Sequence, residues 1–165
     1  MIKVREVAEN EIENVAQFLI RTMGEVYPLP LSERSLRDLW EMKELFLDQQ
    51  DAVFLAAFND HEEVVGTLAL CRYDNRIVSI KDRYDLDSTC EVTKCYVDPV
   101  RRQQGVGSLL FDEALQFVQK AGYRKMYLHT HRFLPGGFTF WSKKGFRIVL
   151  DSQDEYETVH MEKDV

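Results

Sequence analysis

The chain has 165 residues, of which 45% are hydrophobic, 12% aromatic and 30% charged. This length and composition predict one domain over residues 1–165 and exclude disordered, collagenous and low-complexity classes. The formal charge of −7 disfavours nucleic acid and anionic membranes as partners, because proteins bind both with surplus Lys and Arg.

The longest apolar run, Val53 to Phe58, is far shorter than the ~20 residues that span a bilayer. The N-terminus carries acidic residues where a signal peptide has basic ones. Three cysteines (Cys71, Cys90 and Cys95) form no CxxC pair, so neither a disulfide framework nor a zinc knuckle is indicated. We therefore expect a cytoplasmic protein with reduced thiols, no membrane segment and no metal.

Residues 2–5 alternate apolar and polar side chains, which predicts a strand. Apolar residues then recur at helical spacing over 12–19, with Asn10 as the expected N-cap. Prolines break the chain within 27–30.

Ser32 is predicted to cap a second helix, which ends near Gln49 and carries Trp40 on its apolar stripe. Residues 52–58 and 64–71 are rich in β-formers and flank a polar turn. They predict an antiparallel hairpin.

The pattern weakens over residues 72–89. This stretch contains Tyr73, Asp74, Asp82, Tyr84, Asp85 and Asp87. Two interpretations stay open: a solvated excursion, or a wall of a substrate site for cations that includes Tyr84 and Asp85.

Residues 91–97 predict a strand that ends at Asp98-Pro99, and an amphipathic helix follows from Val106 to Val118. Its apolar face includes Leu109. Residues 125–130 form the next strand, and a right-handed crossover makes the two strands parallel.

A short helix over 138–144 precedes a hairpin of 146–150 and 156–161. The sum is an α/β (α+β) fold with a mixed, mostly antiparallel sheet of about seven strands, one central parallel pair and about four helices. An exposed edge in the last hairpin leaves a homodimer open.

The segment from Arg101 to Ser108 joins a strand to the start of a helix, where unpaired N–H groups and the helix dipole favour an anion. Gly105 and Gly107 remove Cβ atoms that would keep a phosphate away from the backbone. A tight strand-to-helix turn is the alternative. The third glycine of a dinucleotide fingerprint and the GK[ST] of a P-loop are missing here.

Two stretches resemble motifs of the GNAT superfamily of N-acetyltransferases. Val97-Asp98-Pro99 followed by Arg102-Gln103-Gln104-Gly105-Val106-Gly107 is similar to its acyl-CoA-binding signature, Q/R-x-x-G-x-G/A. Phe140-Trp141-Ser142-Lys143-Lys144-Gly145-Phe146 resembles its late helix-to-strand motif. The element order agrees over nearly the whole chain.

The resemblance implies direct transfer of an acetyl group from acetyl-CoA to a primary amine, either a small cationic amine or a protein amino group, in a ternary complex. It assigns cofactor contacts to Val97, Arg102, Gln103, Gln104, Gly105, Val106, Gly107, Ser108, Trp141 and Lys143. It also implies that strands 91–97 and 125–130 splay apart to open the cofactor slot. The alternative is a non-catalytic CoA-binding regulatory or interaction module.

Glu91 is the expected general base, because its position 11 residues before Arg102 matches the glutamate base of histone-modifying members. Strand alternation predicts that Glu91, Thr93 and Cys95 share one face. The alternative for Glu91 is an exposed carboxylate at a strand end.

Trp141 stands where many members have a tyrosine that protonates the CoA thiolate, and an indole N–H cannot serve as that acid. Tyr96, Cys95, His129 and His131 remain candidates, as does a thiolate stabilised by the site. The amides of Tyr96 and Val97 match those that polarise the thioester. His129 is also a candidate substrate contact, and the two histidines lack a third metal ligand.

Overall fold

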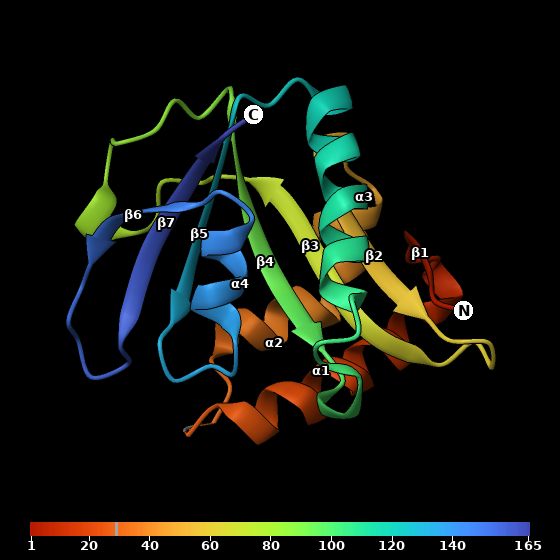
Figure 1. Ribbon diagram of the computed structural model, residues 1–165. Helices are drawn as coiled ribbons and strands as arrows, with labels where there is room; N and C mark the ends of the chain where they lie inside the picture. The colour runs from red at the N-terminus through yellow and green to blue at the C-terminus, as the bar shows by residue number, and fades with distance from the viewer. Residues whose placement is uncertain (29) are drawn as a thin grey trace.

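The computed structural model describes residues 1–28 and 30–165; Leu29, in the predicted break, lies outside the described residues. Seven strands form one sheet in the order β1-β2-β3-β4-β5-β7-β6 (Figure 1). They are β1 (Lys3–Glu6), β2 (Val53–Phe58), β3 (Val64–Arg72), β4 (Thr89–Val97), β5 (Lys125–His131), β6 (Arg147–Asp151) and β7 (Thr158–Asp164). The α-helices are α1 (Ile12–Val26), α2 (Glu33–Trp40), α3 (Val106–Ala121) and α4 (Gly137–Lys143), and a π-helical turn spans Lys43–Leu47.

The strands pair antiparallel except for β4 and β5, which are parallel. Their register joins Thr89 to Lys125, Cys90 to Met126 and Glu91 to Tyr127. Beyond these pairs the two strands diverge (Figure 1). The predicted mixed sheet with one parallel pair is confirmed, and the gap between its diverging strands positions the site.

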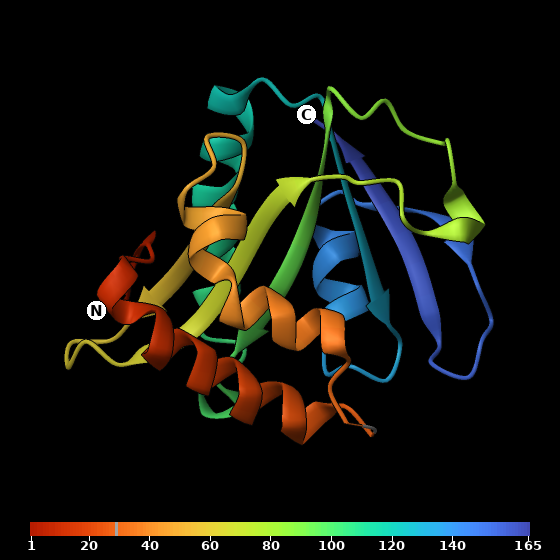
Figure 2. The ribbon, with the colours of Figure 1, turned by 180° about the vertical axis from the view of Figure 1, so that it is seen from behind.

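Helices cover both faces of the sheet. Figure 1 shows α3 and α4 in front, and Figure 2, from behind, shows α1 and α2. The α3 side packs residues such as Leu110, Val118 and Met126, and the α1 side packs Leu19 and Phe54. A Cβ at Gly66 would lie 3.0 Å from Val106 Cγ1, so a glycine in β3 lets α3 approach closely.

The first helix begins later than expected. Glu9–Glu11 form a 3₁₀ turn, and α1 starts at Ile12 with Glu11 as N-cap, so the predicted cap at Asn10 is wrong. The Glu11 carboxylate accepts from the Ala8 N–H at 2.9 Å, and this contact organises the turn. The predicted cap of α2 is confirmed, because Ser32 Oγ accepts from the Ser35 N–H at 3.1 Å.

Two apolar residues that helical spacing places in the core, Trp40 and Leu109, are exposed. Trp40 is 70% exposed, because α2 ends there and the chain continues as the π-helical turn instead of one helix to Gln49. Leu39, on α2, and Phe46, on the turn, are buried instead. Leu109 on α3 is 44% exposed because it lies at the edge of the apolar face.

The loop between β3 and β4 is held by buried aromatic residues. Tyr73 and Tyr84 pack against Tyr127, with ring centroids 5.1 and 5.5 Å away. Tyr84 Oη donates to Glu162 Oε1 at 3.0 Å, and the Lys125 ammonium lies 3.0 Å from Oε2 of the same carboxylate. The loop is therefore anchored to β5 and β7, which a purely solvated excursion would not show.

The last hairpin is confirmed, with β7 between β5 and β6, so β6 is the edge strand. Ile148 on this strand is 44% exposed. Pairing of β6 with a second copy stays a prediction. Among the described residues, no helix is both long enough and apolar enough to cross a bilayer.

Candidate functional site

A β-bulge in β4 sets the directions of the side chains at the site. Lys94 has a left-handed backbone with φ of 53°. Thr67 pairs with Tyr96 whereas Ala69 pairs with Thr93, so β4 carries one extra residue here. The Thr67 hydroxyl donates to the Lys94 carbonyl at 2.6 Å and holds the bulge.

The bulge reverses the alternation of β4. Glu91 pairs with Cys71, which packs on the α1 side of the sheet, whereas Cys95 packs on the α3 side. The prediction that Glu91, Thr93 and Cys95 share one face is therefore wrong for Cys95. An extra residue shifts every later side chain to the other face.

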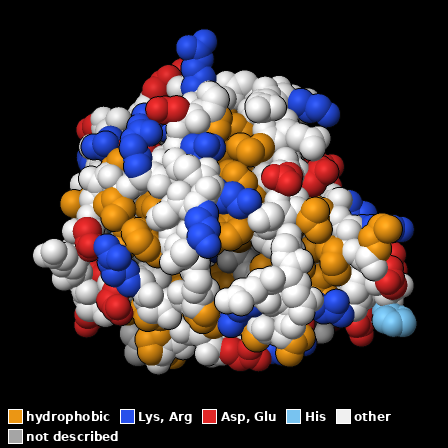
Figure 3. Space-filling view, in the orientation of Figure 1, with side chains coloured by type: hydrophobic (Ala, Val, Ile, Leu, Met, Phe, Trp, Pro, Cys, Tyr) orange, Lys and Arg blue, Asp and Glu red, His pale blue; other side chains and the backbone are white. Residues whose placement is uncertain are grey.

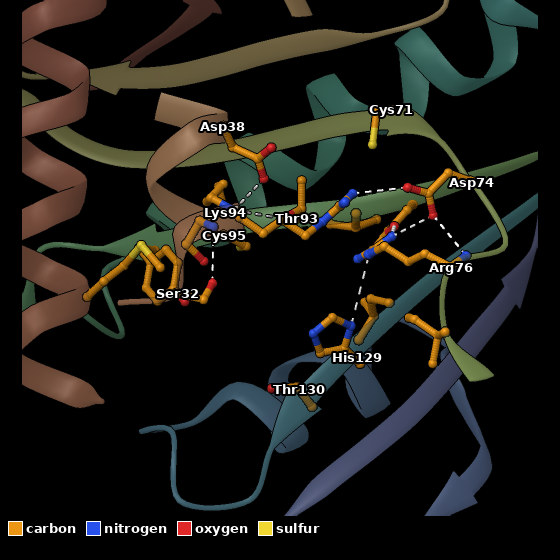
Figure 4. Close-up of a pocket in the computed structure, with 18 of the residues that line it drawn as sticks. Ser32, Asp38, Cys71, Asp74, Arg76, Thr93, Lys94, Cys95, His129 and Thr130 are labelled. Atoms are coloured by element: carbon orange, nitrogen blue, oxygen red, sulfur yellow. Dashed lines mark hydrogen bonds and ion pairs between the residues drawn. The ribbon is translucent and has the colours of Figure 1, made fainter. Parts of the chain in front are cut away.

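A cavity of about 510 Å³ opens where β4 and β5 diverge. Its walls include Val92 to Tyr96 of β4 and Leu128 to Thr130 of β5, with Trp141 from α4. Helix α2 and the β3–β4 loop complete the walls. Figure 4 shows His129, Arg76, Lys94 and Asp38 around this space. The cavity therefore opens into the predicted cofactor slot between β4 and β5 from the face of the sheet that carries α1 and α2.

Glu91 lies at the base of the cavity in a bidentate ion pair. Its two oxygens accept from Arg76 Nη1 and Nη2 at 2.6 and 2.8 Å, and its side chain is only 3% exposed. Arg76 Nη1 also donates to Asp74 at 2.9 Å. Burial alone would lower the pKa of Arg76, but hydrogen bonds to Glu91 and Asp74 raise it. Glu91 is therefore a buried, paired carboxylate and not an exposed strand end.

His129 presents an imidazole to the cavity (Figure 4). Its Nδ1 lies 3.9 Å from Glu91 Oε2. Confinement in the cavity, with His131 and the Arg76 cation nearby, lowers the pKa of His129 below its usual 6.5. The imidazole is therefore neutral at neutral pH, and one of its ring nitrogens can accept a hydrogen bond. The rings of His129 and His131 lie 5.9 Å apart, because residues two apart on β5 point to the same face.

Two more pairs line the α1 and α2 side. Lys94 Nζ, only 7% exposed, contacts Asp38 Oδ2 of α2 at 3.0 Å. Tyr96 donates from its hydroxyl to that of Tyr27 at 3.0 Å. Burial raises the pKa of Tyr96 well above 10, so this hydroxyl stays protonated and remains a proton donor. Burial raises the pKa of Cys95 to about 12, so its thiol is not a thiolate at neutral pH.

The predicted phosphate loop adopts a strained turn that leads into α3. Gln103 and Gly105 have φ of 65° and 84°, and a glycine tolerates such a backbone best. The Leu109 N–H reaches back to the Gly105 carbonyl at 3.1 Å. The N–H groups of Val106, Gly107 and Ser108 precede this bond, as an anion-binding helix start requires.

Glycine is favoured at the two signature positions, Gly105 and Gly107, for different local reasons. A Cβ at Gly105 would meet no atom within 4 Å, so the space before this turn is open to a ligand. A Cβ at Gly107 would lie 3.1 Å from Phe140 Cε1. Gly107 therefore has a packing role in the close approach of α3 to α4, and its part in making room for a phosphate stays a prediction.

Other predicted contacts are distributed around the slot. Trp141 is buried against Phe111 and Phe146 and also lines the cavity. Arg102 is half-buried, whereas Gln103, Gln104 and Lys143 are exposed. Figure 3 shows Lys and Arg side chains near the middle of the face that carries α3 and α4. This loop and face fit an anionic ligand such as the phosphates of CoA.

Sequence reasoning missed some residues of the cavity and assigned others to it that lie elsewhere. Tyr84 contacts Glu162, and Asp85 accepts from Ser88 Oγ at 2.8 Å; neither is among the described residues that line the cavity. Asp74, Arg76 and Ile77 are the loop residues that do line it. Arg76, Asp38 and Lys94 carried no local signal, because each functions through a partner distant in sequence. Among the described residues, no three His, Cys, Asp or Glu side chains group as metal ligands.

Curated proteins with similar sequences are acetyltransferases. The Drosophila melanogaster protein named Probable N-acetyltransferase san is 30% identical over 115 residues, which cover 63% of this chain and 61% of that protein. A Spermidine N(1)-acetyltransferase of Thermoplasma acidophilum is 23% identical over 157 residues, which cover 89% of both chains.

Solved structures share the fold along the whole chain. A GNAT-family acetyltransferase of Staphylococcus aureus Mu50 matches with a TM-score of 0.80 and 20% identity over 99% of both chains. The PaiA N-acetyltransferase of Thermoplasma acidophilum, solved in complex with coenzyme A, matches with a TM-score of 0.73 and 23% identity. This second match covers 100% of the present chain and 99% of the other.

A sequence model of the Acetyltransferase (GNAT) family matches residues 15–146. This range includes most of α1, both predicted motifs and the diverging pair β4 and β5. The chain therefore belongs to the Acetyltransferase (GNAT) family and is an acyltransferase.

Proposed function

We propose that the protein transfers an acetyl group from acetyl-CoA to a primary amine by direct attack. The observation that carries this proposal is the cavity at the divergence of β4 and β5, which holds a neutral imidazole beside a buried carboxylate. The archaeal relative named as a spermidine acetyltransferase supports an amine acceptor. A small cationic amine and a protein amino group are the two acceptor types we consider.

Acetyl-CoA supplies an activated acetyl thioester. Its phosphates would be held by the N–H groups of Gly105 to Ser108, with Arg102 nearby and with Gln103, Gln104 and Lys143 at the exposed rim. Its acyl arm would enter between β4 and β5, where the Tyr96 and Val97 amides are the proposed carbonyl donors. Trp141 forms part of the wall of this slot.

An alkylammonium must lose a proton before its nitrogen can attack. We propose His129 as the group that accepts it, because this imidazole is neutral and faces the cavity. Glu91 then acts as a positioning residue, since its carboxylate stabilises the imidazolium that forms 3.9 Å away. As the N–C bond forms and the C–S bond breaks, Tyr96 donates a proton to the leaving sulfur, and the second proton that the attacking nitrogen loses restores the Tyr96 hydroxyl. Glu91 as the direct base stays a competing prediction, and its pairing with Arg76 disfavours it.

A thermal-shift titration tests the cofactor site. Acetyl-CoA at 100 times its Kd should stabilise the protein by about 2.7 kcal/mol, which raises the Tm by roughly 5 to 11 °C. Gly105→Glu should abolish the shift, because it puts a strained backbone and a like charge before the loop. The matched control is Gly24→Glu, on α1, where a Cβ meets no atom within 4 Å. No shift with the unmodified protein would refute the assignment.

Release of free CoA thiol in the presence of an amine panel tests the reaction. His129→Gln should lower kcat by about 10² to 10⁴, the usual effect of removing a general base. Glu91→Gln, whose amide oxygen can still accept one of the two hydrogen bonds from Arg76, should have a smaller effect. The reverse order of the two effects would identify Glu91 as the base. Binding of CoA without product from any amine would favour the non-catalytic module.

A further inference from the structure

Two tyrosine hydroxyls form a pair in the wall of the cavity. Tyr96 of β4 and Tyr27, the residue at which α1 ends, both line the cavity, and their hydroxyl oxygens lie 3.0 Å apart. Within residues 1–28 and 30–165, each of these hydroxyls has the other as its hydrogen-bond partner. Tyr27 is therefore the group beside the Tyr96 oxygen when Tyr96 gives its proton to the leaving sulfur.

The β-bulge brings Tyr96 to the same side of the sheet as Glu91. These residues are five apart in β4, so plain alternation would place them on opposite faces. The extra residue in β4 shifts Tyr96 to the α1 side, where it packs against the same cluster as Cys71, the cross-strand partner of Glu91. The proposed proton donor and the carboxylate beside the proposed base thus share one face.

The ring of Tyr27 is held from two directions. Its backbone N–H donates to the Met23 carbonyl at 3.0 Å and ends α1. The rings of His131, at the end of β5, and Phe133, in the following loop, meet it edge-on with centroids 5.7 and 5.8 Å away. The Tyr27 hydroxyl is therefore in place before any ligand binds, and no ordering of this group is needed during the reaction.

A single proton donor in this wall would be left with an unfavourable charge. Burial raises the pKa of Tyr96 well above 10, and it also raises the pKa of Tyr27. The cause is that both side chains are withdrawn from the water that stabilises a tyrosinate. Loss of the Tyr96 proton therefore requires that another proton reach the same oxygen in the same step, and the Tyr27 hydroxyl is within hydrogen-bond distance.

The direction of this hydrogen bond can reverse. Tyr96 donates to the Tyr27 oxygen in the structure. A hydroxyl is both a donor and an acceptor, and its hydrogen rotates about the C–O bond. When the Tyr96 hydroxyl turns toward the sulfur, its oxygen is free to accept from Tyr27. A phenylalanine at position 27 would keep the ring contacts and lose this function.

We propose that Tyr27 is a positioning residue that acts through Tyr96, by holding a proton against the Tyr96 oxygen and giving it up during acetyl transfer. This inference rests on the proposed function. As the C–S bond breaks, its electron pair stays on sulfur, which takes the Tyr96 proton. The Tyr96 oxygen takes the Tyr27 proton, and the Tyr27 oxygen takes the second proton that the nitrogen loses. Both tyrosines end protonated.

Single-turnover release of CoA thiol, with protein in excess over acetyl-CoA, measures this step; the acceptor is spermidine or a lysine-containing peptide. Tyr96→Phe should slow release by about 10² to 10⁴, and Tyr27→Phe by about tenfold or more. Tyr27→Phe/Tyr96→Phe should be no slower than Tyr96→Phe, because Tyr27 acts through Tyr96. The matched control is Tyr156→Phe, which removes the hydroxyl of a 39% exposed tyrosine between β6 and β7 and should keep the rate.

Mixtures of H₂O and D₂O give a readout that a purely structural role of Tyr27 would not change. In the unmodified protein more than one proton moves as the sulfur departs, so the plot of rate against deuterium fraction should be curved. In Tyr27→Phe a single proton moves from Tyr96 to sulfur, so the plot should be straight. The Tm of each variant is measured to show that it is folded at the assay temperature.

A Tyr27→Phe rate equal to that of the unmodified protein, with the curvature kept, would overturn the relay and leave amine acetylation standing. A Tyr96→Phe variant with full activity would have the same meaning. If the losses of the two single variants multiply in the double variant, Tyr27 acts independently of Tyr96 and the relay is wrong. Acetylation of neither acceptor by the unmodified protein would contradict the proposed function, and the relay with it.

Discussion

Replacing Arg76 by Met is expected to destabilise the protein strongly. The change removes both donors to a carboxylate whose side chain is 3% exposed, and it leaves the Glu91 charge without its partner. Breaking a buried ion pair in this way costs about 3 to 5 kcal/mol. Because Arg76 is itself 27% exposed, we expect the lower end, about 3 kcal/mol. In a domain of this size that loss lowers the Tm by roughly 6 to 12 °C.

Urea and thermal unfolding measure the loss of stability. Two further variants test whether the loss comes from the unpaired charge of Glu91. Arg37→Met is the matched control, because the Arg37 and Glu41 side chains are 61% and 48% exposed and such solvent-screened pairs contribute little to stability. Arg76→Met/Glu91→Met removes the unpaired charge and should recover most of the loss. A loss below about 1 kcal/mol in Arg76→Met, or a double variant no more stable than the single one, would refute the reasoning.

Three other predictions concern stability and reactivity. Tyr84→Phe removes one donor from buried Glu162 and should cost about 1 to 3 kcal/mol by urea unfolding; if it instead raises the KM for the amine at unchanged stability, Tyr84 binds substrate. Burial raises the pKa of Cys71 and Cys95 to about 12, so a thiol reagent at pH 8 should modify these half-buried cysteines much more slowly in folded protein than in urea, and equal labelling rates would contradict this. Burial lowers the pKa values of His129, His131 and His160 below 6.5. The unfolded chain therefore binds more protons below pH 6.5, and the free energy of unfolding should fall as the pH is lowered from 6.5 to 5. A flat urea midpoint over this window would disprove the shifts.

Local sequence patterns were sufficient to predict most of the helices and strands. The helical spacing over α3, together with Gly122 as its stop, predicts a helix that the structure places at Val106–Ala121 with Gly122 in a left-handed cap. The turn before α3 was also predictable from local sequence, since Gly105 lies close to Arg101 and Arg102 in the chain. The spacing could not show that a second helix would end at Trp40, because that end depends on the packing of Leu39 and Phe46 against the sheet.

The acceptor side was decided by contacts between residues far apart in the chain. Glu91 was recognised as a candidate from its place before the signature, but its pairing with Arg76 joins residues on a loop and a strand that come together only in the folded sheet. The bulge at Lys94 depends on a hydroxyl from β3, and it moved Cys95 to the other face. Spacing within one segment reports how that segment buries its own face, whereas charge pairing and cavity shape are set by the segments that pack against it.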